Sequence, residues 1–234
     1  MTDSPNPYAD TRGMYHVHAL FRREFALLPE VVRGVAEGDK ERAQVVADHF
    51  TLISLLLHLH HSGEDAELWP RLLTRAPKEV DPVIHLVEGH HAGIDALTSE
   101  IEVLLSAWRN SAGADDRDEL ADALQRLVGA LYEHMGLEEK LVLPLIERHI
   151  FASEWEKMVA DEAAQLPPGT GPVLVGMLMY EGGIDSVPPQ IPAVLAEAAP
   201  QAYAAYAEKV HGTATPPRSA ALVLGSPSIS IQPA

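Results

Sequence analysis

The chain has 234 residues, and its 34 Asp and Glu outnumber its 17 Lys and Arg, which gives a net charge of −17. This charge would repel a phosphate backbone or an anionic membrane, so neither nucleic acid nor a membrane is expected as a partner. The sequence has no Cys, which excludes disulfides, thiolate metal sites and Cys nucleophiles. It shows no signal-peptide pattern at its start and no apolar run long enough to span a bilayer, so we expect a cytoplasmic protein.

Apolar spacing and helix-boundary residues indicate helices through the first two thirds of the chain. Residues 1–10, which contain two Pro, are expected to be a disordered lead. Pro29 should kink or break the first helix. Gly38-Asp39 is typical of a helix stop followed by an N-cap, and Pro82, directly after an Asp, is typical of a helix start. Four long helices are predicted, over residues 11–36, 40–75, 81–108 and 116–149.

The remainder is predicted to be a helical extension over residues 153–211, followed by a flexible tail over residues 212–234. A capping box from Ser153 to Glu156 should open its first helix, and residues 173–180 and 191–210 should form two more. We therefore expect an all-α protein, with an antiparallel up-down four-helix bundle over residues 11–152 and a short helical C-terminal extension.

The predicted second and fourth helices carry the same motif. Each contains His-x-x-x-Glu followed by a second acid, with a Pro six residues after the Glu. His60 and Glu64 form the first copy, and His134 and Glu138 form the second, 74 residues later. Residues four apart lie on one face of a helix, so the two side chains of each pair can bind the same ion or group. The repeat indicates that one helical hairpin is used twice.

Two further histidines repeat on the intervening helices. His18 and His91 are 73 residues apart, and each precedes an Ala. Both lie on apolar stripes, and their distances from the predicted turns match those of the His-x-x-x-Glu motifs. One layer of the bundle should therefore contain His18, His60, Glu64, His91, His134 and Glu138.

A layer of this kind points to metal ions. Buried carboxylates and imidazoles are costly unless they are paired, and cations would allow all six to be buried together. Mixed imidazole and carboxylate ligands suit zinc, copper, nickel and iron, and two symmetry-related pairs suit two ions that share carboxylates.

These segments resemble the hemerythrin-like, or His-His-Glu cation-binding, domains over residues 11–150. The resemblance rests on a His on each of four helices, on the His-x-x-x-Glu motifs, and on the segments Leu68-Trp-Pro70 and Leu143-Pro-Leu145. Residues 176–215 look like an extension found in some actinobacterial members. The resemblance implies a four-helix bundle with two iron ions, a non-haem Fe–O–Fe di-iron centre bridged by oxygen and by Glu64 and Glu138, that reacts with O2, H2O2 or NO.

The sequence departs from the oxygen carriers of this family at one ligand. They place a second His four residues before the third-helix His, where this chain has Val87. His61 is the preferred replacement, because Glu64 lies between His60 and His61 on the helical wheel. The alternatives, in order, are His90, a tyrosine such as Tyr180 or Tyr206, and open solvent access.

The other polar residues near the motifs have simpler interpretations. Asp65 and Glu139 follow the two motif Glu residues and could accept hydrogen bonds from ligand imidazoles, although solvated charge is equally plausible. His16 and His49 are expected to face solvent or to lie at helix packing edges.

Four functions are consistent with such a centre. The first is a peroxidase-like or catalase-like enzyme that decomposes H2O2 or consumes NO with peroxide. The second is O2 binding or storage without turnover, and the third is iron or oxygen sensing. The fourth is a zinc-stabilised interaction module, which would need fewer ligands. The sequence does not identify a protein partner.

Overall fold

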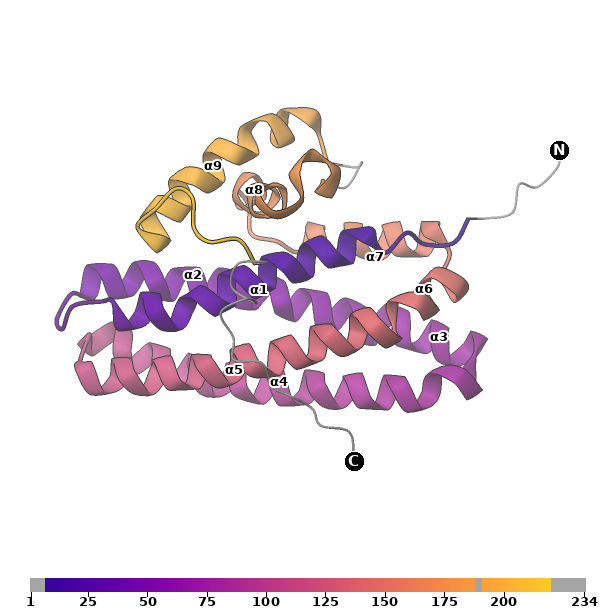
Figure 1. Cartoon of the computed structure of the whole chain (residues 1–234), viewed down its shortest axis with the longest axis horizontal. Helices are drawn as coiled ribbons and strands as arrows, with labels where there is room; N and C mark the ends of the chain where they lie inside the picture. Colours follow the sequence, from indigo (N-terminus) through magenta and orange to yellow (C-terminus); the bar gives the residue numbers. More distant parts are fainter. Residues whose placement is uncertain (1–6, 188–190, 220–234) are drawn as a thin grey trace.

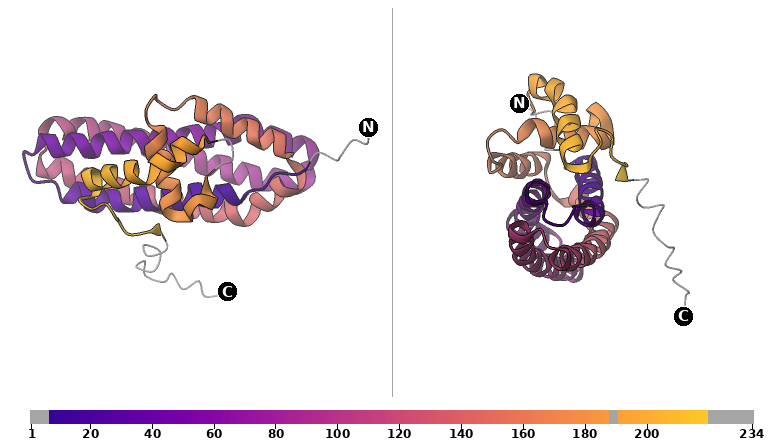
Figure 2. Two further views of the ribbon diagram at one scale, coloured as in Figure 1. Left: turned by 90° about the horizontal axis from the view of Figure 1, so that it is seen from above. Right: turned by 90° about the vertical axis from the view of Figure 1, so that its left-hand side faces the viewer.

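The computed structural model of the chain describes residues 7–187 and 191–219. Four long helices form an antiparallel bundle: α1 (Arg12–Arg33), α2 (Lys40–Gly63), α4 (Pro77–Ser111) and α5 (Ala114–Leu141). Helix α1 contacts α2 and α5, and α4 contacts the same two helices, so the four close into a ring that is seen end-on in Figure 2. The predicted all-α fold is confirmed over the described residues.

Two of the predicted long helices are interrupted near a Pro. After α2 the chain continues as a π-helical segment, η1 (Glu64–Leu68), and then as the short helix α3 (Trp69–Arg75). After α5 comes the short helix α6 (Leu143–His149). Pro70 and Pro144 lie in the first turns of α3 and α6, where the N–H that Pro lacks would have no partner in any case.

One predicted helix start at a Pro differs from the structure, and one predicted break is absent. Helix α4 begins at Pro77, five residues before the predicted start signal, and Pro82 lies inside it. Pro77 and Pro82 both have the fixed φ angle that suits the first position of a helix. The helix begins at the earlier of the two. Helix α1 continues without a break across Pro29 as far as Arg33. The predicted cap at Asp39 is confirmed, because its carboxylate accepts a hydrogen bond from the Arg42 N–H.

The C-terminal extension comprises α7 (Ala152–Ala164), α8 (Gly171–Gly182), the 3-10 turn η2 (Gly183–Ser186) and α9 (Ala193–His211). Helices α8 and α9 form a hairpin that lies on α1 and α2, above the bundle in Figure 1. The first helix starts differently from the prediction. Glu154 accepts a hydrogen bond from the Phe151 N–H at 3.0 Å, so the N-terminal cap is at Phe151 and not at Ser153.

Both ends of the described chain contact the folded core. Within the expected lead, Tyr8 pairs with Phe151, and the N–H of Ala9 donates to the carbonyl oxygen of Ile150 at 2.9 Å. Within the expected tail, the Tyr180 hydroxyl donates to the carbonyl oxygen of Pro216 at 2.7 Å. Residues 1–6 and 220–234, which complete those two predicted segments, lie outside the described residues.

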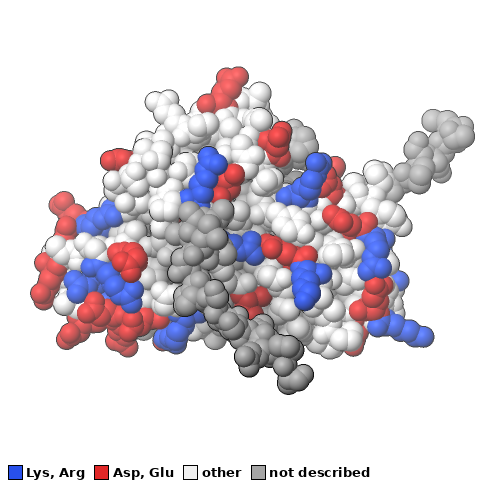
Figure 3. Space-filling model, viewed as in Figure 1, with Lys and Arg blue, Asp and Glu red and all other residues white. Residues whose placement is uncertain are grey.

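The bundle interior contains two apolar clusters with a polar layer between them. Along α1, Met14 belongs to one cluster and Phe21 to the other, and the buried His18 lies between them. The cluster that includes Phe21 extends to Trp108 near the far end of the bundle. Outside, acidic and basic side chains are interspersed on the face shown in Figure 3. None of the described helices is long and apolar enough to cross a membrane.

Candidate metal centre

Every long helix of the bundle contributes side chains to the polar layer at the same depth. Helices α1 and α4 contribute His18 and His91, and α5 contributes the pair His134 and Glu138. The pair on the other side differs locally, because His60 lies near the end of α2 and Glu64 is the first residue of the π-helical segment η1. Such π-helical turns often mark functional sites. No residue pattern in the sequence indicated this one.

The side chains separate into two groups, each around a common point. His18, His60 and Glu138 form the first group, in which one ligand atom of each residue lies within 4.8 Å of the others. His61 and His91, together with His134, form the second group by the same measure. All of these residues are buried.

Glu64 and Glu138 link the two groups, and one ligand atom of each lies within 4.8 Å of the other and of His134. Glu64 approaches His60 Nε2 at 3.5 Å through Oε1, and His91 Nε2 at 3.4 Å through Oε2. Glu138 Oε2 lies 3.3 Å from His18 Nε2 and 3.5 Å from His134 Nε2. Each carboxylate therefore contacts one histidine of each group, and each is placed to bind a cation in both groups at once.

The buried polar atoms at the centre lack hydrogen-bond partners. Both carboxylate oxygens of Glu64 and of Glu138, both ring nitrogens of His61, and the Nε2 atoms of the other four histidines are buried without one. Leaving such groups unsatisfied costs about 1–3 kcal/mol each, and more for charged groups. Since the unpaired atoms converge from four helices, this donor set fits metal ions.

The protonation states of three imidazoles agree with this interpretation, whereas the carboxylates of Glu138 and Glu139 raise the pKa of His18 against the effect of burial. Burial lowers the pKa of His60 to about 3 and that of His134 to about 4, and it also holds the pKa of His61 well below its ordinary value. These rings are thus neutral at neutral pH, as metal ligands must be. Burial and the neighbouring charge of Glu138 raise the pKa of Glu64 well above its ordinary value. Without a metal Glu64 therefore keeps a proton beside the ionised Glu138, and a bound cation would take the place of that proton.

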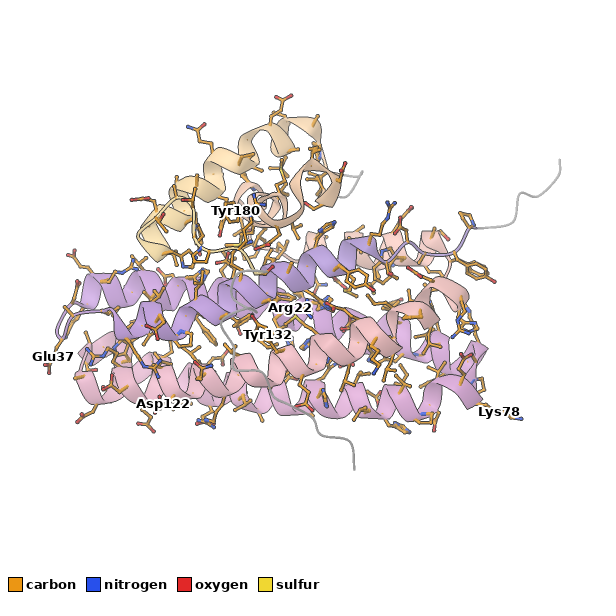
Figure 4. The ribbon with its side chains drawn as sticks, in the orientation of Figure 1. Arg22, Glu37, Lys78, Asp122, Tyr132 and Tyr180 are labelled. Carbon is orange, nitrogen blue, oxygen red and sulfur yellow. The ribbon has the colours of Figure 1, made fainter. Side chains whose placement is uncertain are left out.

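Two outer carboxylates fix the orientation of ligand-group imidazoles. Asp65 Oδ1 lies 2.8 Å from His91 Nδ1 and accepts a hydrogen bond from Trp69 Nε1 at 2.8 Å. Glu139 Oε1 lies 2.9 Å from His18 Nδ1 and accepts a hydrogen bond at 2.6 Å from Arg22, which Figure 4 shows between α1 and α5. These contacts leave Nε2 of each ring directed at the centre. The two acids occupy equivalent places in the repeat, as their sequence positions suggested.

The remaining candidates for the extra ligand lie elsewhere. His90 is only partly buried, and its ring centroid is 6.1 Å from that of His134. Tyr206 contacts His49 at 3.0 Å, and Tyr180 bonds to Pro216. His61 instead stacks on His91 with ring centroids 4.1 Å apart. The solvent-facing alternative for His49 was wrong, since this residue is fully buried where α2 packs against α9, in a separate cluster beneath the extension.

The sequence did not predict that one further carboxylate lies next to the centre. The carboxylate of Glu162, on α7, reaches the backbone of α2 at Gly63, where a Cβ would lie 2.0 Å from Glu162 Oε1. Burial raises the pKa of Glu162 to about 8, and Oε1 has no hydrogen-bond partner. A glycine next to Glu64 is therefore what admits this carboxyl.

Comparison with known proteins identifies the family. The model of the hemerythrin HHE cation-binding domain matches residues 10–146, and matches again over residues 83–164. The second match starts 83 − 10 = 73 residues after the first, which equals the spacing of His18 and His91. Searches of curated proteins and of solved structures gave no match. The first match covers more than half of the chain, and the protein therefore belongs to the hemerythrin HHE cation-binding family.

Proposed function

We propose that the chain binds two iron ions and uses them to decompose H2O2 or to consume NO together with peroxide. The proposal rests on the unequal division of the ligand groups. If Glu64 and Glu138 serve both ions, the ion near His61, His91 and His134 has five protein ligands. The ion near His18 and His60 has four and keeps open positions.

The group with vacant coordination positions, which contains His18 and His60, favours iron. Two histidines with carboxylate ligands and vacant positions are the arrangement found in non-haem iron sites that react with oxygen species. The proposed ligands are His18 and His60 on one side, His61, His91 and His134 on the other, with Glu64 and Glu138 between them. His61 thus replaces the ligand that Val87 cannot provide.

Charge favours an anionic small molecule as the reactant. Five neutral imidazoles and two carboxylates around two divalent ions give a formal charge of +4 − 2 = +2. In a buried site this excess attracts anions such as deprotonated peroxide. Bound iron would supply the redox chemistry, and the protein would hold the imidazoles in place through Asp65 and Glu139.

The apolar side chains around the proposed centre limit the size of the reactant. Phe21, Ile94 and Leu131 are each at most 1% exposed and lie next to the ligand positions along their helices. The Phe21 ring is 5.5 Å from that of His60. Apolar walls of this kind exclude large or strongly hydrated molecules, which favours H2O2, NO and O2 as the molecules that reach the centre.

Two assays test this function: O2 release from H2O2, and peroxide-dependent loss of NO. The wild type should be active in at least one, and His134→Ala should lose that activity together with metal. His90→Ala is a matched control, because it removes a neighbouring imidazole that belongs to neither group, and it should retain activity. If the wild type turns over neither substrate while its reduced form takes up and releases O2, the protein is an oxygen-binding protein and the proposal fails.

A further inference from the structure

A second cluster of titratable side chains lies between the bundle and its extension. It joins Glu24 of α1, His49 of α2 and His211, the last residue of α9. The side chains of Glu24 and His49 are fully buried, and that of His211 is 3% exposed. Three elements that are far apart in sequence thus place one carboxylate and two imidazoles at the same buried point.

The geometry of this cluster matches that of the metal centre. Glu24 Oε2 lies 3.0 Å from His211 Nε2 and 3.3 Å from His49 Nε2. The corresponding histidine–carboxylate distance between His18 and Glu138 is also 3.3 Å. The rings of His49 and His211 meet edge to face, with centroids 5.3 Å apart and an interplanar angle of 84°. In the metal centre, His18 and His60 meet at 5.6 Å and 82°.

The outward-facing atoms of Glu24 and His49 already have partners, whereas the buried Nδ1 of His211 has none. Glu24 Oε1 accepts hydrogen bonds from Arg23 Nε and from the Tyr203 hydroxyl, both at 2.8 Å. His49 Nδ1 lies 3.0 Å from the Tyr206 hydroxyl. Metal ligands are held by outer hydrogen bonds of this kind, which leave the opposite atom free for the metal. At the common point His49 Nε2 has no hydrogen-bond partner, while Glu24 Oε2 and His211 Nε2 share a hydrogen bond of 3.0 Å that a metal ion would replace.

We propose that Glu24, His49 and His211 bind a single divalent transition-metal ion of the zinc class. Two histidines and a glutamate are a known zinc ligand set, and ligands about 2.0–2.1 Å from a tetrahedral zinc lie roughly 3.3 Å apart. The cluster has the matching spacing. This site is separate from the proposed iron centre and does not depend on its function.

The charges around the cluster balance before a metal binds. Arg23 and Arg42 stand against Glu24 and Glu181, and these four charges sum to zero. A surface cavity of about 360 Å³ has His211 in its wall, together with Leu27 and Val31 of α1 and Arg42 of α2. Of the three proposed ligands, His211 lines this cavity and Glu24 and His49 do not, so an ion would approach the cluster from the His211 side.

A metal at this point would fasten the extension to the bundle. One ligand comes from α9 and two come from the bundle, so the ion would cross-link them at the end of α9. The Tyr180 ring, which Figure 4 shows where α8 faces α1, stacks on the Arg23 guanidinium 5.1 Å from its centroid and belongs to the same interface. Metal binding should therefore stabilise the docked extension, because metal affinity adds to folding stability.

The test compares zinc content among variants of the full chain. Each protein is stripped with a chelator, reloaded with Zn²⁺ and freed of excess metal. His49→Gln and His211→Gln should each hold one equivalent less than the wild type, and zinc should raise their melting temperature less. Glutamine can still donate a hydrogen bond to Glu24, so a cluster that is only hydrogen-bonded would survive these changes. His16→Gln is the matched control, because His16 lies at the same interface against Gly182 but in none of the candidate groups.

A second measurement avoids the risk that a variant misfolds. Wild-type protein whose main centre is already loaded with metal is titrated with Zn²⁺, and one further equivalent should bind. Equal zinc content in the wild type and both glutamine variants would overturn the proposal, as would the absence of an additional equivalent in the titration. Because both readouts are differences of one equivalent, they do not depend on which metal occupies the main centre or on its activity.

Discussion

Replacing Glu139 or Asp65 by alanine should weaken one metal position of the centre while the other position stays closer to normal. Glu139 orients His18, which belongs to the first ligand group, and Asp65 orients His91, which belongs to the second. Without its acceptor, each ring loses the contact that directs Nε2 to the centre. The metal in the corresponding group should therefore be released first.

The structure sets the size of each effect. Loss of an outer hydrogen-bond partner typically weakens metal binding about 10–100-fold, or about 1.4–2.8 kcal/mol. The Asp65 side chain is 47% exposed, so water can replace part of its contact, and we expect about a tenfold effect. The Glu139 side chain is 21% exposed and also pairs with Arg22. Its removal leaves that positive charge near His18, so we expect an effect nearer 100-fold.

Chelator competition measures these affinities, with metal loss followed per chain over a range of chelator concentrations. Each variant should show two steps, of which only one is shifted from the wild type. Glu88→Ala is the matched control, because it removes a carboxylate that contacts the exposed His85 on α4. If Asp65→Ala and Glu139→Ala both behave like this control, the two acids do not support the centre and the assignment of the ligand groups is wrong.

Four further changes test other parts of the account. Glu138→Ala should remove at least one metal and lower the melting temperature, and full occupancy would contradict the shared-carboxylate role. His61→Ala should alter the spectrum and the metal content while His90→Ala changes neither, and the reverse result would move the extra ligand to His90. Glu162→Gln should raise the melting temperature at pH 8 but hardly at pH 4.5: burial raises the carboxyl pKa from 4.5 to about 8, so stability falls as pH rises between these values. Gly176→Val should lower the melting temperature without removing metal from the centre, because a Cβ at Gly176 would lie 2.3 Å from a carbonyl oxygen of α9.

The arrangement of the main centre was predictable because it depends on helix periodicity. The four-residue spacing of His60 and Glu64 places both on one helix face, and the repeat fixes the depth of His134 and Glu138 in the bundle. The structure brings these residues together with His18 and His91, as expected from the matched distances to the turns.

The features that escaped prediction depend on contacts between segments distant in sequence. The cluster at His49 exists only because α9 folds back onto α1 and α2, and nothing in the local pattern of His211 indicates that docking. The position of Glu162 against Gly63 is of the same kind. The start of α4 is different, since Pro77 and Pro82 are both valid start signals and local preference alone could not choose between them.

The central claim is that one chain holds two iron ions in the layer formed by the seven proposed ligands. It is tested most directly by iron analysis of protein purified under air, combined with X-ray absorption at the iron edge. The account predicts two irons per chain, separated by about 3.5–4 Å and bound mainly by imidazole and carboxylate. One iron per chain, or two irons without a short iron–iron distance, would contradict it.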